Sequence, residues 1–232
     1  MAPIAIHRVT QLDLNVRPRR WLFAEQRRAD IDAHFAVQQR EKPIWNGRIL
    51  LARDPDFSAD RFSAGYFETD FASFLAWRDW GCPDKDVFNG FGMGALRCSD
   101  GAFILGEMGQ HTANAGRIYF PSGTPDLDDI REGAVDMSGS VTREVEEETG
   151  LTPADYRASP HWDCVVSGAA IAMIRILHVD VSGEALRARI EANLARQEQP
   201  ELSAIHLVHD TRDLTAAMPR FVTAFIEAQT GS

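Results

Sequence analysis

The sequence contains few cysteines and no long apolar run. Cys82, Cys98 and Cys164 are odd in number, lie far apart and form no C-x-x-C pair, which argues against a disulfide framework and against a cysteine zinc site. The N-terminal segment lacks the apolar core of a signal peptide, and the most apolar later run, residues 169–174, is far too short to cross a bilayer. We therefore expect reduced thiols, a cytoplasmic location and no membrane partner.

An excess of positive charge is also missing. The chain has 24 Lys and Arg against 34 Asp and Glu, for a net charge of −10, which disfavours a protein that binds nucleic acid through its phosphates. No repeat or low-complexity tract is present. With 232 residues, 44% of them apolar and 25% charged, the composition is that of a globular protein with one large domain or two small ones.

The pattern of residues changes near residue 85, which predicts an N-terminal subdomain (1–86) and a second domain (87–232). In the first part, residues 9–16 are expected to be extended, 21–40 helical and 48–52 a strand. The stretch 61–81 is rich in aromatic residues, whose spacing resembles one face of a helix. We predict a small α+β subdomain that contributes to substrate binding or to a homodimer interface.

The second part alternates strand and helix signals, which predicts a mixed α/β fold. Two apolar runs flank Ser99-Asp100-Gly101, a hairpin signal. A helix is predicted from Ser138 or Ser140, as N-cap, to a stop at Gly150. The other expected elements are strands at 117–120, 163–168, 169–181 and 204–209 and helices at 184–197 and 220–228.

The helix around REVEEETGL (143–151) places four glutamates within five residues, although like charges on one helix face repel each other. Positions three and four apart share a face, so Glu144, Glu147 and Glu148 converge while Glu146 points away. Convergent carboxylates suit Mg²⁺ or Mn²⁺. The alternative is a solvated acidic face, with Arg143 pairing with a neighbouring glutamate.

The same stretch matches the pattern R-E-U-x-E-E-x-G-U, with U aliphatic, at every specified position. It resembles the second half of the Nudix box, G-x5-E-x7-R-E-U-x-E-E-x-G-U. The first half does not match, because the glutamate position falls on Val135 and the glycine position on Asp129. Gly123 follows a strand and a proline as the box glycine does. Asp136 is the acid nearest to the missing glutamate, and Glu132 is the alternative.

The resemblance implies an α/β/α sandwich with a mixed sheet and hydrolysis of a nucleoside diphosphate linked to a moiety X. The expected products are a nucleoside monophosphate and phosphorylated X. Mg²⁺, which Mn²⁺ can replace, would be held by Glu144, Glu147 and Glu148, with a main-chain contact from Ser122 or Gly123. By the same resemblance, Arg143 orients the glutamates. The general base would be Glu144 or an acid of a later loop, Glu201 or, alternatively, Glu198.

A diphosphate also needs positive partners, and a base or sugar ring needs a surface to stack on. Arg97, Arg117 and Arg175 are the candidate cations, with Gly123 and Asp136 as further substrate contacts. The candidate rings are Trp77, Trp80, Phe91 and Trp162, and His111 and His161 are loop candidates. For each arginine the alternative is an ordinary surface position, and for each ring it is the core.

The stretches WNGRILLARDP and YFETDFASFLAWRDWG resemble the leader of Nudix hydrolases that act on nucleotide sugars, which favours a UDP-sugar-like X. The alternatives for X are ADP-ribose, coenzyme A and dinucleotides. A different class of function is a sensor that binds such a nucleotide without cleaving it. The complete set of acidic positions in the helix favours the enzyme.

Overall fold

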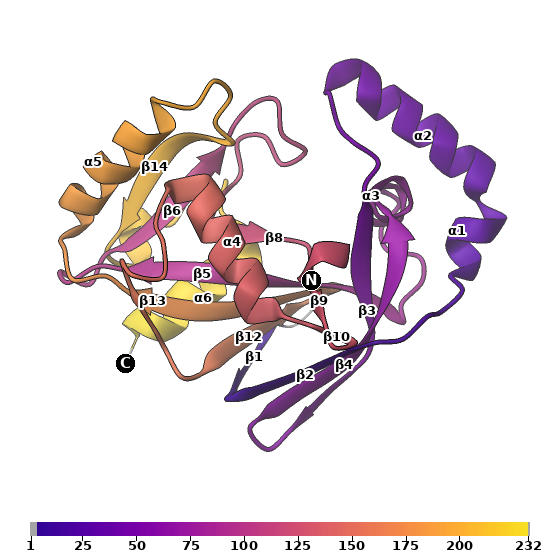
Figure 1. Cartoon of the computed structure of the whole chain (residues 1–232), viewed down its shortest axis with the longest axis horizontal. Helices are drawn as coiled ribbons and strands as arrows, with labels where there is room; N and C mark the ends of the chain where they lie inside the picture. The colour runs from indigo at the N-terminus through magenta and orange to yellow at the C-terminus, as the bar shows by residue number, and fades with distance from the viewer. Residues whose placement is uncertain (1–3, 232) are drawn as a thin grey trace.

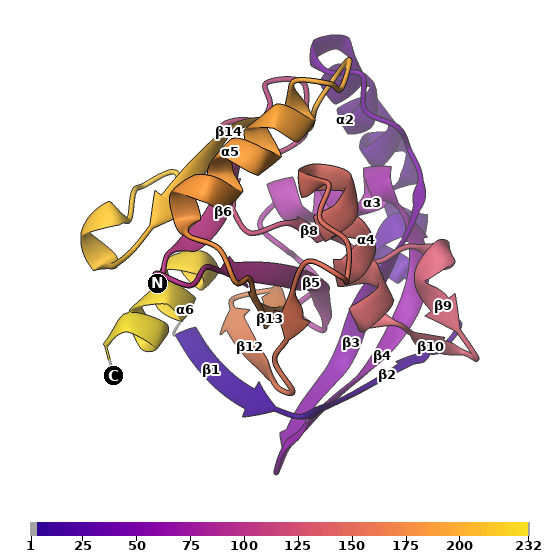
Figure 2. The ribbon, with the colours of Figure 1, turned by 60° about the vertical axis from the view of Figure 1, so that its left-hand side comes forward.

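The computed structural model describes residues 4–231, which form a mixed α/β fold around one large mixed sheet (Figures 1 and 2). Its central strand, β5 (Val87–Arg97), pairs in parallel with β13 (Ala170–His178) and antiparallel with β3 (Arg48–Ser58). The neighbours along the sheet follow the order β1-β12-β13-β5-β3-β4-β2-β10-β9. The predicted fold class, with its mixed sheet, is confirmed.

The remaining elements have the following bounds. The helices are α1 (Leu22–Gln26), α2 (Arg28–Glu41), α3 (Phe71–Asp79), α4 (Met137–Thr149), α5 (Gly183–Leu194) and α6 (Arg220–Thr230), with 3₁₀ turns at Leu127–Asp129 and Thr211–Asp213. The strands are β1 (Ile4–Val9), β2 (Gln11–Val16), β4 (Arg61–Asp70), β6 (Phe103–Met108), β7 (Ile118–Tyr119), β8 (Ser122–Gly123), β9 (Ile130–Arg131), β10 (Ala134–Val135), β11 (Arg157–Ala158), β12 (Trp162–Ser167) and β14 (Leu202–Val208).

The side chains of β5 alternate between the two faces of the sheet, and this alternation explains why helices cover both faces. Its glycines Gly92 and Gly94 face α4, and a β-carbon on either would lie 2.5 Å from a valine of that helix. On the opposite face, the ring of Phe91 meets Phe221 of α6 with their centroids 5.4 Å apart. Because successive strand residues point to opposite faces, small residues bring α4 close on one side while aromatic rings pack with α6 on the other.

The first 86 residues are joined to the rest by strand pairing. In this segment β1 pairs with β12, β2 pairs with β10, and β3 pairs with β5. Helices α2 and α3 have a small apolar cluster of their own, around Ile31, Phe35 and Leu75, and they lie beside the main sheet in Figure 1. The division after residue 86 therefore stays a prediction about folding units.

One local prediction is wrong and another holds only in part. The helical spacing expected for the aromatic residues between 67 and 77 applies from Phe71 onward, because β4 runs to Asp70, whose side chain caps α3 by accepting a hydrogen bond from Ser73 N. The residues around this boundary fit both the alternation of a strand and the spacing of a helix, so the sequence pattern alone does not show where the strand ends. The N-cap of α4 is Asp136, which accepts from Gly139 N, rather than Ser138 or Ser140.

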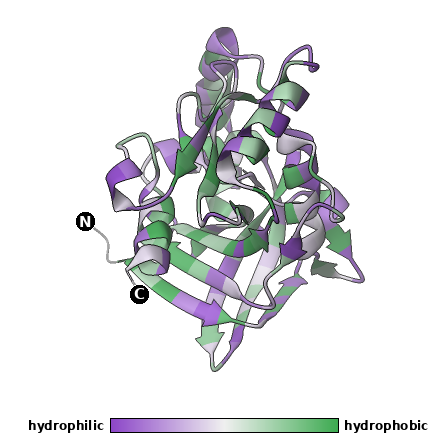
Figure 3. Cartoon of the chain, turned by 90° about the vertical axis from the view of Figure 1, so that its left-hand side faces the viewer, coloured by the Kyte–Doolittle hydropathy of each residue, from purple (hydrophilic) through white to green (hydrophobic). Residues whose placement is uncertain are grey.

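Helices in Figure 3 carry both hydrophobic and hydrophilic residues, as expected when one side of each is buried. Among residues 4–231, no helix is long and apolar enough to cross a membrane.

Candidate active site

Helix α4 packs against the sheet, and both of its ends are defined by capping residues. The Asp136 carboxylate accepts from Gly139 N at 2.9 Å, and Gly150 ends the helix in the left-handed conformation, with φ of 74°. Both features are standard helix boundaries. Val141 and Val145 are buried against β5. With one side fixed in this way, the glutamates of α4 take defined positions beside β8.

Glu148 is a buried carboxyl group with an unused oxygen. Only 3% of the residue is exposed, and its Oε1 accepts from Ser122 N at 3.2 Å. Its Oε2 is buried and has no hydrogen-bond partner among the described residues. Burial raises the pKa of Glu148 well above its usual range, although the hydrogen bond from Ser122 opposes the shift. A buried polar atom without a partner is costly and calls for an explanation such as a bound ion.

Glu144 lies against the next residue of β8. A β-carbon built on Gly123 would stand 2.2 Å from Glu144 Oε1, so only glycine leaves room for this carboxylate. The side chain is 15% exposed and accepts from Arg143 Nη2 at 3.2 Å. Burial raises the pKa of Glu144 to about 7, against the lowering effect of Arg143, and the charges of Glu147 and Glu201 add to the increase.

Arg143 is fixed by Asp129, an acid that the sequence pattern does not single out. Its Nη1 and Nη2 donate to the two carboxylate oxygens of Asp129 at 2.9 and 3.2 Å. The Asp129 side chain is only 3% exposed and also accepts from Ser140 Oγ and Asp126 N. Asp129 occupies the position where the box pattern has glycine, fourteen residues before Arg143, and no spacing rule marks it.

The other predicted acids, apart from Glu144 and Glu148, are exposed. Glu147 is largely exposed, with 4.0 Å between its carboxylate and Arg143 Nε, and Glu146 is exposed as expected. Glu201 precedes β14 and is exposed, and its negative charge adds to the raised pKa of both Glu144 and Glu148. Glu198 is exposed.

The residues fit a hard divalent cation, but they do not form a preassembled cage. Within residues 4–231, no group of three or more His, Cys, Asp or Glu side chains stands in a metal-binding arrangement. The fit rests on two carboxyl groups beside β8, the half-buried Glu144 and the buried Glu148, of which Glu148 has an unpartnered oxygen. Carboxylate oxygens of this kind are the ligands that Mg²⁺ takes, leaving other positions to water and phosphate.

A cavity of about 640 Å³ adjoins the carboxylates, because Ser122 and Gly123, which touch Glu148 and Glu144, also line it. Six of the residues that line it are aromatic. The rings are Phe71, Phe74, Trp77, Phe91, Tyr119 and Phe221. Volume and lining are those of a site for a small organic ligand.

Two of the four predicted rings, Trp77 and Phe91, line this cavity. Trp80 instead packs near Phe23 and His34, and Trp162 lies under Arg175, whose guanidinium carbon is 5.1 Å from the ring centroid.

Only some of the predicted substrate-binding residues line the cavity. Arg117 lines the cavity, as does Gly123. Arg97 lies at the far end of β5, with its guanidinium 5.3 Å from the ring centroid of Phe103. Asp136 serves as the cap of α4, and Glu132 occupies an exposed turn with φ of 51°.

Neither of the two loop histidines lines the cavity. His161 is within hydrogen-bonding distance of Ser159 Oγ, and His111 sits beside Gly109.

No model of a known protein family matches the sequence, and no curated protein is similar to it. The chain is similar to a solved Nudix hydrolase from M. smegmatis, RenU, with 12% identity over 62% of this chain and 86% of that one and a TM-score of 0.41. It is similar to the MutT protein from Methanosarcina mazei Go1, with 16% identity over 61% and 91% and a TM-score of 0.35.

A third similar structure is a bifunctional NMN adenylyltransferase/ADP ribose pyrophosphatase from Francisella tularensis. The identity is 13% over 58% of this chain and 37% of that one, with a TM-score of 0.35. Likenesses this distant say nothing about the reaction, so the function must be inferred from the site residues.

Proposed function

We propose that the protein is a Mg²⁺-dependent diphosphatase that hydrolyses a nucleoside diphosphate linked to a moiety X. The observation that carries the proposal is the pair of carboxyl groups of Glu144, which is half-buried, and Glu148, which is buried, set against Gly123 and Ser122 beside a ligand-sized cavity. Burying two acids together costs free energy. A divalent cation and a phosphate would offset that cost, and the R-E-U-x-E-E-x-G-U pattern supports the same conclusion.

Glu144 and Glu148 would supply the principal metal ligands, with Glu147 and the main chain at Ser122 as further ones. When bound, Mg²⁺ would neutralise the repulsion between these acids and polarise the phosphate oxygens. Arg143, locked on Asp129, keeps the Glu144 carboxylate in place through its remaining hydrogen bond. Glu201, whose charge contributes to the raised pKa of Glu144, is the candidate to take a proton from the attacking water. Water adds to phosphorus as the phosphorus–oxygen bond of the diphosphate breaks.

The N-terminal segment supplies part of the ligand cavity in this account. The Asn46 side chain accepts from Ala72 N at 2.8 Å and so helps to set the start of α3. That helix contributes Phe74 and Trp77 to the aromatic wall. The leader-like residues therefore act through the position of α3, and a UDP-sugar-like X is the finer hypothesis that their resemblance supports.

A panel assay tests the proposal. UDP-glucose, ADP-ribose, coenzyme A, NADH, dinucleoside polyphosphates and simple nucleoside triphosphates are incubated with the protein in Mg²⁺, in Mn²⁺ and in EDTA. We expect release of nucleoside monophosphate from one class, and only with metal. If no compound is cleaved while a nucleotide still raises the melting temperature, the non-catalytic sensor is the better description. Cleavage that continues in EDTA would contradict the assigned chemistry.

A further inference from the structure

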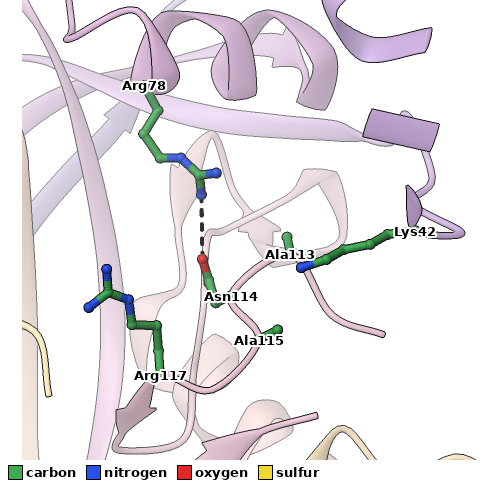
Figure 4. Close-up of a pocket in the computed structure, with 6 residues that line it drawn as sticks. All are labelled: Lys42, Arg78, Ala113, Asn114, Ala115 and Arg117. Carbon is green, nitrogen blue, oxygen red and sulfur yellow. Dashed lines mark hydrogen bonds between the residues drawn. The ribbon is translucent and has the colours of Figure 1, made fainter. Parts of the chain in front are cut away.

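A second, smaller cavity of about 380 Å³ lies between the N-terminal segment and the 109–117 loop (Figure 4). Its charged lining is entirely basic. The residues that line it are Lys42, Arg78, Ala113, Asn114, Ala115 and Arg117. Lys42 follows α2, Arg78 belongs to α3, and Arg117 precedes β7. Three cations from three separate parts of the chain therefore line one cavity.

Most of this positive charge is not neutralised by the protein itself. Lys42 Nζ donates to the main-chain oxygen of Thr112 at 2.7 Å. Within residues 4–231, neither Lys42 nor Arg117 has a carboxylate within 4.0 Å. Arg78 is the exception, with Asp79 at 3.1 Å. In a chain of net charge −10, unpaired cations gathered in a cavity favour an anionic ligand.

The basic cavity is continuous with the aromatic one. Arg78, Asn114 and Arg117 line both. Asn114 Nδ2 donates to the hydroxyl of Tyr119 at 3.2 Å. Burial raises the pKa of that hydroxyl, and the charges of Glu148, Glu201 and Glu144 add to the increase. A ligand held at the carboxylates can thus extend past Tyr119 to the three cations.

We propose that the Lys42–Arg78–Arg117 cavity binds a phosphate monoester of the ligand, so that the substrate carries a phosphate in addition to its diphosphate. The inference of a substrate rests on the proposed function; the anion site itself does not. Arginine forks and a lysine point charge together suit a dianionic group with several acceptor oxygens. An uncharged sugar end would leave these cations without a partner, so this site favours a substrate with a further phosphate, as in coenzyme A, over the UDP-sugar that the leader resemblance suggests.

Direct binding tests the site without any turnover. Inorganic phosphate is titrated calorimetrically into the full-length protein in EDTA, for wild type, Arg117→Gln, Lys42→Met and the control Arg40→Gln. Arg40 is an exposed cation two residues from Lys42 and lines neither cavity. We expect saturable binding in wild type and control and a loss of about tenfold in affinity in each pocket variant. Equal affinity in all four proteins, or no binding in wild type, would overturn the proposal.

Matched substrate pairs test the consequence for specificity. Coenzyme A and NADPH each carry one phosphate more than dephospho-coenzyme A and NADH. We expect kcat/KM to favour the phosphorylated member about tenfold in wild type, through KM, and the preference to disappear in Arg117→Gln. An unchanged preference in that variant would contradict the site.

The two proposals fail separately. Phosphate binding that depends on Arg117 in a protein that cleaves nothing would keep the anion site and reject the hydrolase. Metal-dependent cleavage without phosphate binding would keep the hydrolase and reject the anion site. The Glu148→Gln variant should still bind phosphate in EDTA while losing turnover.

Discussion

Glu144 and Gly123 are so close that any β-carbon at position 123 would stand 2.2 Å from the Glu144 carboxylate. This contact joins α4 to β8 at the point where the cavity begins. It makes the absence of a side chain at residue 123 a requirement of the proposed metal site, independent of backbone conformation.

The first prediction follows from that contact. Gly123→Ala should lower kcat/KM by about 10- to 100-fold, because the Glu144 carboxylate must move away from its position. Gly65→Ala is the control, since a β-carbon there would meet its nearest atom, Cδ of Arg17, at an ordinary 3.6 Å. If both variants retain wild-type kinetics, Glu144 does not need its present position.

A second prediction uses three neighbouring glutamates of α4. Glu148→Gln and Glu147→Gln should each lower turnover by at least about 10²-fold at saturating Mg²⁺, because each removes a ligand charge. Glu146→Gln changes the same charge on the exposed side of the helix and should keep turnover within about twofold. Circular dichroism checks that all three fold. Equal losses in the three variants would indicate a general charge effect instead of a metal site.

Asp129 provides the third prediction. Asp129→Asn removes the charge that holds both terminal nitrogens of Arg143 and should lower the free energy of unfolding by about 2 kcal/mol. Turnover should also fall, since Arg143 then loses its fixed position beside Glu144. Urea unfolding and steady-state kinetics measure the two effects. Asp128→Asn, next along the chain and exposed, should change neither. A stable and fully active Asp129→Asn protein would show that the ion pair is dispensable.

The raised pKa of Glu144 gives a prediction for the metal-free protein. Burial raises the pKa of Glu144 from the ordinary glutamate value of 4.5 to about 7 in the folded state, so the folded state holds the proton more tightly. Its contribution to stability is complete below about pH 4.5 and is lost as the pH rises through 7. In EDTA, the melting temperature should therefore fall by a few degrees between pH 5 and pH 7.5.

The matched variant for this pH effect is Glu144→Gln, which should show a smaller fall over the same range because its amide does not titrate. Mg²⁺ should restore the wild-type melting temperature at pH 7.5, where the carboxylate form is available to the cation. An identical fall in wild type and Glu144→Gln would assign the pH dependence to other groups.

The sequence predicted the acidic helix well, because the information is local. Spacings of three and four residues place Glu144 and Glu148 together, and Gly150 marks the end of the helix through its left-handed conformation. The mixed sheet was also predictable from alternating strand and helix signals.

What the sequence could not give depends on contacts between distant segments. Asp129 reaches Arg143 only because a 3₁₀ turn and the β9–β10 hairpin bring it back to α4. Likewise, Lys42 and Arg78 meet Arg117 only through the packing of the N-terminal helices beside the 109–117 loop. The start of α3 was not predictable for a different reason, because strand alternation and helical spacing overlap around residue 70.

The central claim is that the Glu144–Glu148 pair holds the divalent cation on which the chemistry depends. Its most direct test is a titration of Mn²⁺, followed by electron paramagnetic resonance, into wild type, Glu148→Gln and Glu146→Gln at pH 7.5. We predict that wild type and Glu146→Gln bind the ion with similar affinity and that Glu148→Gln binds it at least about tenfold more weakly. Equal Mn²⁺ affinity in all three proteins would contradict the account.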